Sequence, residues 1–394
     1  MKLPTVTILA GRDRRVRQGH PWVFANEIQM DQNAKAIAPG SLVKLQTENG
    51  EKLGVAGFNP HVLIAAWRLD PRPDAKIDRI WFAQKFAAAQ ALRQRFLRTP
   101  FYRLVHAEAD GLPGLIVDLY SDTAVVQANT ATMDSLLPDI VPALTEITSA
   151  RNVVLVRSGA AVQQEGLAEE SRLLAGTLDG PLQVDENGAN FFSDPLGGQK
   201  TGWFYDQRDN RAFAAKLCGG AEVLDVYCYA GGFGVLAATQ MAREVTMVDR
   251  SAAALALAER ASEANTVHDR CRFLKMDALD ALELMTAKGR HFDVVIADPP
   301  AFIKSRKDMA AGLKGYRKLA RLAAGVVKHG GILCLGSCSH HAEQAAWSEE
   351  NVRGIYEAGR SGRIVRTSGA GADHPVHPLL PESAYLKFQV FQLD

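Results

Sequence analysis

Alternating strand-like and helix-like segments in the second half of the chain constrain its fold more than any other feature. The runs EVLDV, EVTMVD and CRFLK are each followed by a turn and a stretch of helical periodicity, and HFDVVIA continues the rhythm. Three further strand-like runs follow: GGILCLGS, GRIVRTS and YLKFQVFQL. Repeated strand–helix units predict a parallel sheet covered by helices on both faces. Because such sheets bind ligands at the carboxyl ends of their strands, the residues there are the candidates for chemistry.

The rest of the chain predicts two smaller domains. A length of 394 residues is too great for one typical core, so two or three domains are expected. Residues 1–72 hold short β-type runs such as SLVKLQ and VLIAAWRL, and the Pro-rich segment DPRPDAK follows them as a linker. Residues 73–183 alternate two amphipathic helices with strands and predict a central α+β domain. Residues 184–394 contain the strand–helix repeat.

Charge and cysteine content exclude several classes of protein. The chain has no apolar run long enough to span a membrane and no recognisable signal peptide, so a cytoplasmic protein is expected. Five cysteines without regular spacing indicate neither a disulfide framework nor a zinc site. With a net charge of +1, a nucleic-acid binder of this sequence would have to use local basic patches.

Two basic patches are candidates for contact with a nucleic-acid backbone. The first consists of Arg12, Arg14, Arg15 and Arg17. The second is a Lys- and Arg-rich segment, read here as a loop from Lys304 to Arg321, that includes Arg306 and Lys307. The alternative for either patch is an ordinary solvated surface.

Acidic residues end the first three strands of the repeat. Asp225 precedes the turn YAGGFG, Asp249 ends the second strand, and Asp277 follows the third. A carboxylate at the second position can bind both ribose hydroxyls, as in nucleoside-binding folds, and Asp277 could reach an adenine amino group. The turn lacks the GxGxxG pattern of dinucleotide-binding proteins. A phosphate-binding site would avoid these acids, whereas a cationic nucleoside such as S-adenosylmethionine suits them.

The fourth and fifth strands end in residues suited to nucleobase chemistry. Asp298 precedes two prolines that restrict its backbone, so its carboxyl group could face a ring nitrogen of a base while Phe302 stacks on the ring. Cys338 lies between two serines at the tip of the fifth strand and precedes His340 and His341. A free cysteine is often only a small buried residue, but this position favours a nucleophile whose pKa a histidine could lower. The other cysteines are expected to be buried.

Taken together, these motifs resemble a known family. The segments DVYCYAGGFG, VDRS, ADPPAFIKSRKDM and GSCSHH, together with GHPWVFANEI and GGQKTGWFYDQRDNR, are similar to class I S-adenosylmethionine-dependent 23S rRNA (cytosine-5) methyltransferases with an N-terminal PUA domain. The resemblance covers nearly the whole chain. It implies a PUA domain over residues 1–72 and a Rossmann-like domain of seven strands with the last strand antiparallel. It also implies ribosomal RNA as partner and S-adenosylmethionine as cofactor, and leaves a homodimer open.

The resemblance also implies roles for particular residues. Cys338 and Asp298 would be catalytic: the thiolate adds to C6 of a cytosine, which makes C5 nucleophilic, while Asp298 holds N3. Many related enzymes carry a second cysteine in the DPP loop, which is absent here, so the base that removes the C5 proton is not identified. The residues implied to bind the cofactor are Gln199, Thr201, Phe204, Asp206, Asp225, Tyr227, Ala230, Gly231, Gly232, Asp249, Arg250, Asp277, Ala278 and Asp298.

Three alternatives remain open. The DPP loop also suits methylation of a base nitrogen, which needs no thiol, although Cys338 favours carbon. A PUA-type RNA-binding protein without activity is disfavoured because all four strand-end carboxylates are present. A nucleotide-dependent dehydrogenase is disfavoured by the missing GxGxxG pattern.

Overall fold

The computed structural model describes residues 3–197 and 201–394, which group into two compact units. The first unit comprises Met1–Gly180, Asp194–Trp203 and Ala372–Pro381, and the second comprises Pro181–Ser193, Phe204–Gly371 and Glu382–Asp394. In the described part of the chain the strands form four sheets, two in each unit. No helix in this part is both long and apolar enough to cross a membrane.

The first unit begins with a five-stranded sheet of order β1-β3-β4-β5-β2. Its strands are β1 (Thr5–Ile8), β2 (Trp22–Phe24), β3 (Ser41–Thr47), β4 (Lys52–Phe58) and β5 (Ile64–Asp70). Short helices α1 (Arg14–Arg17) and α2 (Gln32–Lys35) and the 3-10 turn η1 (Ala25–Glu27) connect them. The inward residues Val43, Leu45 and Phe58 are fully buried, as their alternation along the strands predicts.

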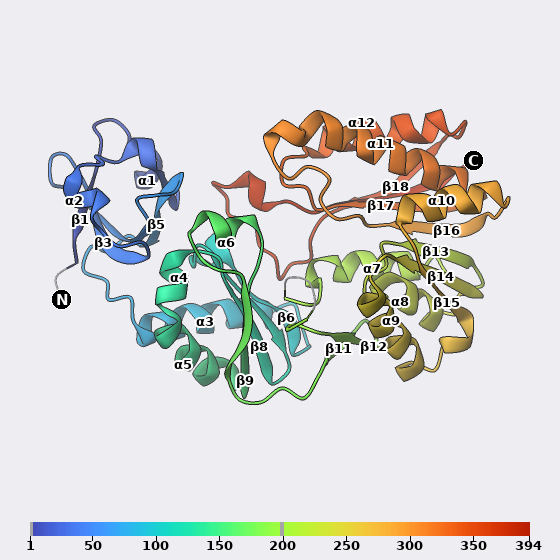
Figure 1. Ribbon diagram of the computed structural model, residues 1–394, viewed down its shortest axis with the longest axis horizontal. Coiled ribbons are helices and arrows are strands. Elements are labelled where there is room, and N and C mark those ends of the chain that lie inside the picture. The colour runs from blue at the N-terminus through green and yellow to red at the C-terminus, as the bar shows by residue number, and fades with distance from the viewer. Residues whose placement is uncertain (1–2, 198–200) are drawn as a thin grey trace. The chain divides into compact units, whose positions relative to one another are not determined.

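A second five-stranded sheet, of order β10-β9-β8-β7-β6, completes the first unit. Its strands are β6 (Phe101–His106), β7 (Leu115–Tyr120), β8 (Thr123–Ala128), β9 (Asn152–Arg157) and β10 (Glu170–Ala175). The accompanying helices are α3 (Arg79–Arg93), α4 (Ala131–Ser135), α5 (Leu137–Thr148) and α6 (Ala160–Gln164), with the turn η2 (Ala107–Asp110). Helices α3 and α5 lie side by side along this sheet (Figure 1). Asp78 caps α3, because its carboxylate accepts a hydrogen bond from the backbone N–H of Trp81.

The second unit contains the predicted repeat as a seven-stranded sheet of order β15-β14-β13-β16-β17-β19-β18. Its strands are β13 (Glu222–Val226), β14 (Glu244–Asp249), β15 (Cys271–Lys275), β16 (Phe292–Ala297), β17 (Val327–Ser337), β18 (Gly362–Ser368) and β19 (Lys387–Leu393). Among the described strands of this sheet, β19 pairs antiparallel with both β17 and β18, whereas β13 to β17 pair in parallel with one another. The predicted fold class, including the antiparallel last strand, is therefore confirmed.

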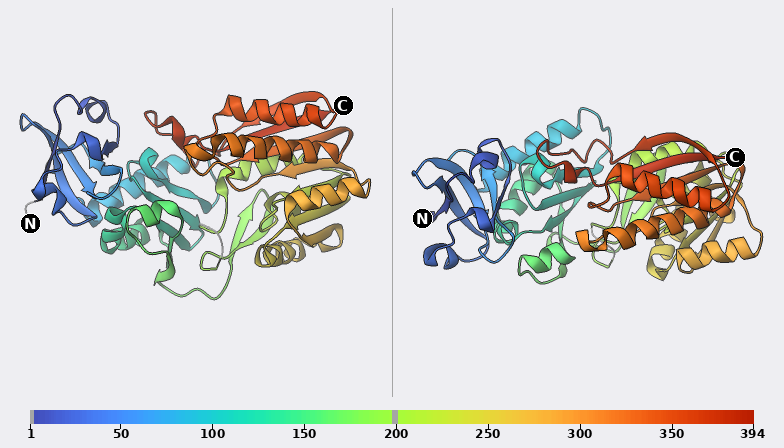
Figure 2. Two further views of the ribbon diagram at one scale, coloured as in Figure 1. Left: turned by 45° about the horizontal axis from the view of Figure 1, so that its top comes forward. Right: turned by 90° about the horizontal axis from the view of Figure 1, so that it is seen from above.

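Helices cover both faces of this sheet. On one side lie α7 (Arg208–Ala215), α8 (Gly232–Thr239) and α9 (Ala252–Ala264), and on the other lie α10 (Ala278–Ala287), α11 (Met309–Gly325) and α12 (Gln344–Glu357) (Figures 1 and 2). The helices α11 and α12 pack against each other along their length. The remaining 3-10 turns are η3 (Tyr205–Gln207), η4 (His268–Arg270), η5 (Arg306–Asp308) and η6 (Pro381–Ser383).

Two local features differ from the sequence-based expectations. The segment from Lys304 to Arg321 is mainly helical rather than a loop, because α11 begins at Met309 and buries Tyr316 and Leu319 against the sheet. A two-stranded hairpin, β11 (Leu182–Glu186) with β12 (Ala189–Ser193), precedes the repeat. The sequence patterns predict no strand in this segment.

Candidate active site

The carboxyl ends of the parallel strands lie at one edge of the seven-stranded sheet, where a turn with unusual backbone angles follows β13. Tyr227, Tyr229 and Gly231 have positive φ angles of 62°, 48° and 78°. Residues other than glycine rarely adopt positive φ angles, so Tyr227 and Tyr229 indicate a backbone whose conformation is held by its surroundings, as is common at functional sites. A Cβ atom at Gly231 would lie 2.9 Å from the Cβ of Ala258, so this position requires glycine.

Asp225 lies fully buried beneath this turn. Its Oδ2 accepts a hydrogen bond of 2.8 Å from the backbone N–H of Gly234, in the first turn of α8. Burial is the main reason that the pKa of Asp225 is raised to about 8; the hydrogen bond from Gly234 opposes this shift, and the charges of Asp298 and Asp249 contribute to it. Asp249 and Asp298 are thus close enough to act on Asp225, and their negative charges make the site receptive to a cation.

Asp249 connects β14 to the same turn. Its two carboxylate oxygens accept hydrogen bonds from the backbone N–H groups of Tyr229 (3.0 Å) and Ser251 (2.8 Å). The ring of Phe204 meets that of Tyr229 edge-on, with 5.5 Å between centroids. Two segments implied by the resemblance, one around residue 204 and one around residue 229, therefore lie together.

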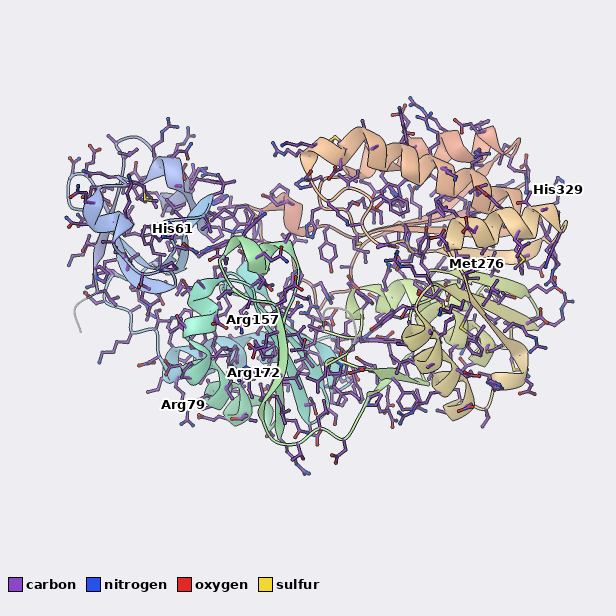
Figure 3. The ribbon with its side chains drawn as sticks, in the orientation of Figure 1. His61, Arg79, Arg157, Arg172, Met276 and His329 are labelled. Atoms are coloured by element: carbon purple, nitrogen blue, oxygen red, sulfur yellow. The ribbon has the colours of Figure 1, made fainter. Side chains whose placement is uncertain are left out.

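Asp277 is exposed just after β15, where it caps α10 by accepting a hydrogen bond of 2.9 Å from the N–H of Leu279. Burial raises the pKa of the Tyr227 hydroxyl, and the charge of Asp277 adds to this effect. Ala278 is buried and Arg250 is exposed at the same edge. Met276, which precedes Asp277, marks this edge in Figure 3, whereas His329 marks the start of β17 at the other end of the sheet.

Asp206 presents a buried carboxylate oxygen without a partner among the described residues. The side chain is 7% exposed, and the hydroxyl of Tyr385 donates a hydrogen bond of 2.5 Å to its Oδ2. Its Oδ1 accepts no hydrogen bond from the residues that the structure describes. Because a buried unsatisfied carboxylate oxygen is costly, this atom is a candidate for contact with a cationic or hydrogen-bond-donating ligand.

Asp298, directly after β16, is oriented by an amide. The side-chain amide of Gln207 donates a hydrogen bond of 2.8 Å to its Oδ2, and the Gln207 oxygen in turn accepts one of 2.7 Å from Asn210. This second bond fixes which way the Gln207 amide points. On β17, Gly336 leaves room for the carboxylate, since a Cβ there would lie 2.2 Å from Oδ1 of Asp298.

Cys338 follows β17, which pairs with β16, so the thiol lies beside the loop that carries Asp298. The two flanking serines turn inward: Ser337 and Ser339 hydrogen-bond to the buried hydroxyl of Tyr316 at 2.8 Å and 2.7 Å. Cys338 lies between these two serines in the chain and is partly exposed, whereas both serines are buried. Its Sγ lies 4.0 Å from the carbonyl oxygen of Pro299.

The cysteines differ in accessibility, as predicted. Cys338 is partly exposed, whereas Cys218, Cys228, Cys271 and Cys334 are buried. Burial raises the pKa of each of these four thiols, to about 12 for Cys218 and Cys271. Reactivity of a cysteine requires access and a thiolate, so only Cys338 among the five suits a nucleophile.

Two of the residues predicted to bind the cofactor, Gln199 and Thr201, are not part of the site described above. Gln199 lies outside the described residues altogether. Thr201 belongs to the first unit, where it is buried and its carbonyl accepts a hydrogen bond of 2.8 Å from Tyr120.

The predicted basic patches differ in how many of their charges are available. Arg15 forms an ion pair with Glu27 at 2.9 Å, and Arg17 is bound by Asp13 and Glu51. Arg12 and Arg14 are exposed and form no ion pair within the described chain. Lys304, Arg306 and Lys307 are likewise exposed in or beside η5, with no ion pair to any described residue.

Sequence reasoning missed four residues of the site: Gln207, Tyr316, Tyr385 and Lys387. Gln207 and Tyr316 lie in segments that read as a polar stretch and a basic surface. Tyr385 lies two residues before β19, and Lys387 is the first residue of that strand. Their distance in sequence from the residues that they contact leaves no local signal. The inward face of α11, with Tyr316 three residues before Leu319, is the one pattern that could have indicated a buried tyrosine.

Comparison with known proteins places the chain among methyltransferases. A protein-family model described as an S-adenosylmethionine-dependent methyltransferase matches residues 114–350, and one described as a PUA-like domain matches residues 6–71. The curated protein named ribosomal RNA large subunit methyltransferase I from Photobacterium profundum is 33% identical over 391 residues. That alignment covers 97% of this chain and 98% of the relative.

Solved structures share the fold at lower sequence identity. A chain described as a SAM-dependent methyltransferase from Streptococcus mutans is 19% identical, with a TM-score of 0.82, covering 99% of this chain and 100% of that one. Another, described as a methyltransferase complexed with SAH, has a TM-score of 0.84 at 19% identity and the same coverage of both chains.

Proposed function

The chain belongs to the S-adenosylmethionine-dependent methyltransferase family, and on this premise we propose that it methylates C5 of a cytosine in large-subunit (23S) ribosomal RNA. The observation that carries the proposal is the position of Cys338. It is the accessible thiol at the tip of β17, beside the oriented carboxylate of Asp298, while the other four cysteines are buried. Methylation of a base nitrogen would require no such thiol. The relatives' name supports ribosomal RNA as the substrate.

S-adenosylmethionine is the cofactor of this family, and the residues at the sheet edge fit it. Its sulfonium and amino groups are cationic, which suits the carboxylate of Asp249, whose charge acts on Asp225, and the Oδ1 of Asp206, which no described residue satisfies. Because residue 231 is a glycine, no side chain projects from this position of the turn toward Ala258. When bound, the cofactor supplies an electrophilic methyl group.

We assign cofactor contact to the strand-end residues and their turn. Asp249 would hold the ribose and Asp277 the adenine, while Phe204 and Asp206 would contact the methionine end. Further contacts are assigned to Gln199, Thr201, Asp225, Tyr227, Ala230, Gly231, Gly232, Arg250, Ala278 and Asp298. A fully buried Asp225 would act mainly through the turn that it supports, by accepting the hydrogen bond from the backbone N–H of Gly234.

The chain's own groups would prepare the base for methylation. The Cys338 thiolate forms a bond to C6 of the cytosine, and the electron pair of the C5–C6 double bond moves toward C5 and N3. Asp298, carrying or sharing a proton at N3, offsets the charge that develops there. After methylation a base removes the C5 proton, and the electron pair expels the Cys338 thiolate. Gln207 keeps Asp298 facing the base, because its amide donates to the other oxygen of that carboxylate.

RNA binding would use the N-terminal PUA-like region and the basic patches. We retain the division into domains of residues 1–72, 73–183 and 184–394, with the first as the RNA-binding module. Arg12 and Arg14 in this module are exposed, and their positive charges are available to RNA phosphates. The exposed side chains of Lys304, Arg306 and Lys307 offer positive charge beside the candidate site. Such contacts to phosphate position an RNA without reading its sequence. A cytoplasmic location and a homodimer complete the proposal.

The test is to incubate the protein with labelled S-adenosylmethionine and 23S RNA that lacks its modifications, then to digest the RNA and identify the methylated nucleoside. The expected product is 5-methylcytidine, lost in Cys338→Ala. Cys334→Ala, the same change in the buried part of the same strand, serves as the control and should keep activity. A methylated nitrogen, or full activity of Cys338→Ala, would overturn the carbon-methylation mechanism. Absence of any transfer would support the RNA-binding alternative.

A further inference from the structure

Lys387, the first residue of β19, is a buried lysine next to the proposed nucleophile. It is 4% exposed and lies opposite Ser337 in the antiparallel pairing of β17 with β19. Its Nζ donates hydrogen bonds to the carbonyl oxygens of Ser339 (2.9 Å) and Tyr385 (2.7 Å). Ser339 directly follows Cys338, so this bond holds the amine at the loop that carries the thiol.

The hydrogen-bond geometry leaves one direction on Nζ for a third partner. A protonated lysine has three N–H donors, and a neutral one has two donors and a lone pair. Within the described residues, the two carbonyls use two of these directions. The third can accept a proton when Lys387 is neutral, or donate one to an anion when it is charged.

Electrostatics link this amine to Cys338. Burial lowers the pKa of Lys387 to about 8, and the charge on Cys338 is the effect that opposes this shift. Interactions of this kind are reciprocal: if the thiolate favours the ammonium form, the ammonium form favours the thiolate by the same free energy. Within the described ranges, Cys338 is thus the anionic group whose charge acts on Lys387.

We propose that Lys387 activates Cys338 by taking the proton of its Sγ and then holding the thiolate as an ion pair. The S–H bond breaks and an N–H bond forms, so the neutral pair becomes a thiolate and an ammonium ion with no change in total charge. When the thiolate later leaves C6 of the base, it returns to the same ammonium group. Lys387 would thus be a positioning residue that acts through Cys338. The inference rests on the proposed role of Cys338.

The other titratable groups around Cys338 are less suited to this role. The Tyr316 hydroxyl of α11 is engaged with Ser337 and Ser339, and Asp298, after β16, would oppose a thiolate by its own charge. His340 is exposed, its ring stacks on Tyr385 at 4.9 Å between centroids, and its Nδ1 lies 3.3 Å from the carbonyl oxygen of Glu382. His341 follows it in the chain and is tested as an alternative together with His340.

The test measures the thiolate directly, without RNA or cofactor. Wild-type protein and the variants Lys387→Met and Lys387→Arg are alkylated with iodoacetamide between pH 5 and pH 10, and the Cys338 peptide is quantified by mass spectrometry. In the wild type the alkylation midpoint should lie below the ordinary cysteine pKa of about 8.5. Lys387→Met should raise the midpoint by at least about one pH unit, which makes alkylation at pH 7 about 10-fold slower. Lys387→Arg should keep it low, since arginine stays charged.

Three results would overturn the proposal. They are a wild-type midpoint at or above that of an ordinary thiol, an unchanged midpoint in Lys387→Met, and a midpoint that moves in His340→Ala or His341→Ala but not in Lys387→Met. A melting curve would reveal whether Lys387→Met folds. If it does not fold, the wild-type alkylation midpoint still tests the proposal, because a midpoint at or above that of an ordinary thiol overturns it. A low midpoint that depends on Lys387, in a protein that makes no 5-methylcytidine, would support the ion pair while refuting the proposed reaction.

Discussion

The carboxylate of Asp298 lies against the bare backbone of Gly336, where an added Cβ would come within 2.2 Å of Oδ1. Asp298 follows β16 and Gly336 lies in β17 two residues before Cys338, so the absence of one side chain lets two catalytic candidates share a small space. Gln207 holds the carboxylate from its other oxygen. The site is therefore sensitive to a single methyl group on β17.

Gly336→Ala should reduce methylation strongly while leaving the fold largely intact. The new Cβ must displace Asp298, and misplacement of a catalytic group by about 1 Å can cost about 100-fold in rate. The measurement is kcat on unmodified 23S RNA together with the affinity for S-adenosylmethionine. Gly325→Ala at the end of α11 is the control, because a Cβ there meets no atom within 4 Å. Equal activity of the two variants would contradict the assigned role of Asp298.

Tyr316→Phe should destabilise the protein and loosen the loop that carries Cys338. The change removes the hydroxyl that joins Ser337 and Ser339 and leaves buried hydroxyl groups without their partner. Leaving such groups unsatisfied costs about 1–3 kcal/mol in the free energy of unfolding. Chemical denaturation measures this cost. Tyr356→Phe on the neighbouring helix α12 is the control, since Tyr356 is 67% exposed. A loss as small as that of the control would refute the prediction.

Asp225 should make the stability of the protein fall as pH rises. Its folded-state pKa of about 8 lies above the ordinary value of 3.8, so between these values the folded protein holds one proton more than the unfolded chain. The free energy of unfolding then decreases with pH, by about 1.4 kcal/mol per pH unit from this group. Asp225→Asn removes the contribution and keeps an acceptor for Gly234. Denaturation of both proteins from pH 5 to pH 7 should give a steeper fall for the wild type; parallel curves would be inconsistent with a raised pKa.

Reversing the charge of Lys304 and Arg306 should weaken RNA binding and leave cofactor binding nearly unchanged. Both side chains are exposed and form no ion pair with a described residue, so their charge is available to phosphates. The slope of log affinity against log salt concentration should fall by about two, because two cations no longer neutralise RNA phosphates. Filter binding and cofactor titration measure the two affinities. The control is Lys288→Glu. Lys288 is an exposed lysine at the C-terminal end of α10, whereas Asp277 at the candidate site lies at the N-terminal end of that helix. Equal weakening of both affinities would exclude a specific role in RNA binding.

Local patterns in the sequence were sufficient for much of the architecture. The period-two and period-3.6 alternation of apolar residues is a property of neighbours in the chain, and it predicted the strands and helices of the repeat and the edge at which they end. It also placed Asp225, Asp249, Asp298 and Cys338 at strand ends, because each directly ends or follows an apolar run. The second of the two helices expected within residues 73–183 is divided into α4 and α5.

Only the tertiary structure decided which side chains meet. Gln207 reaches Asp298 across 91 positions of sequence, and Lys387 reaches the carbonyl next to Cys338 across 48. Both interactions depend on strand order, since β13 is flanked by β14 and β16 and the antiparallel β19 lies between β17 and β18. Register and strand order arise from packing over the whole sheet, which no local window of sequence contains. The sequence by itself thus determined which chemical groups stand at the edge of the sheet, and tertiary packing decided which of them act on one another.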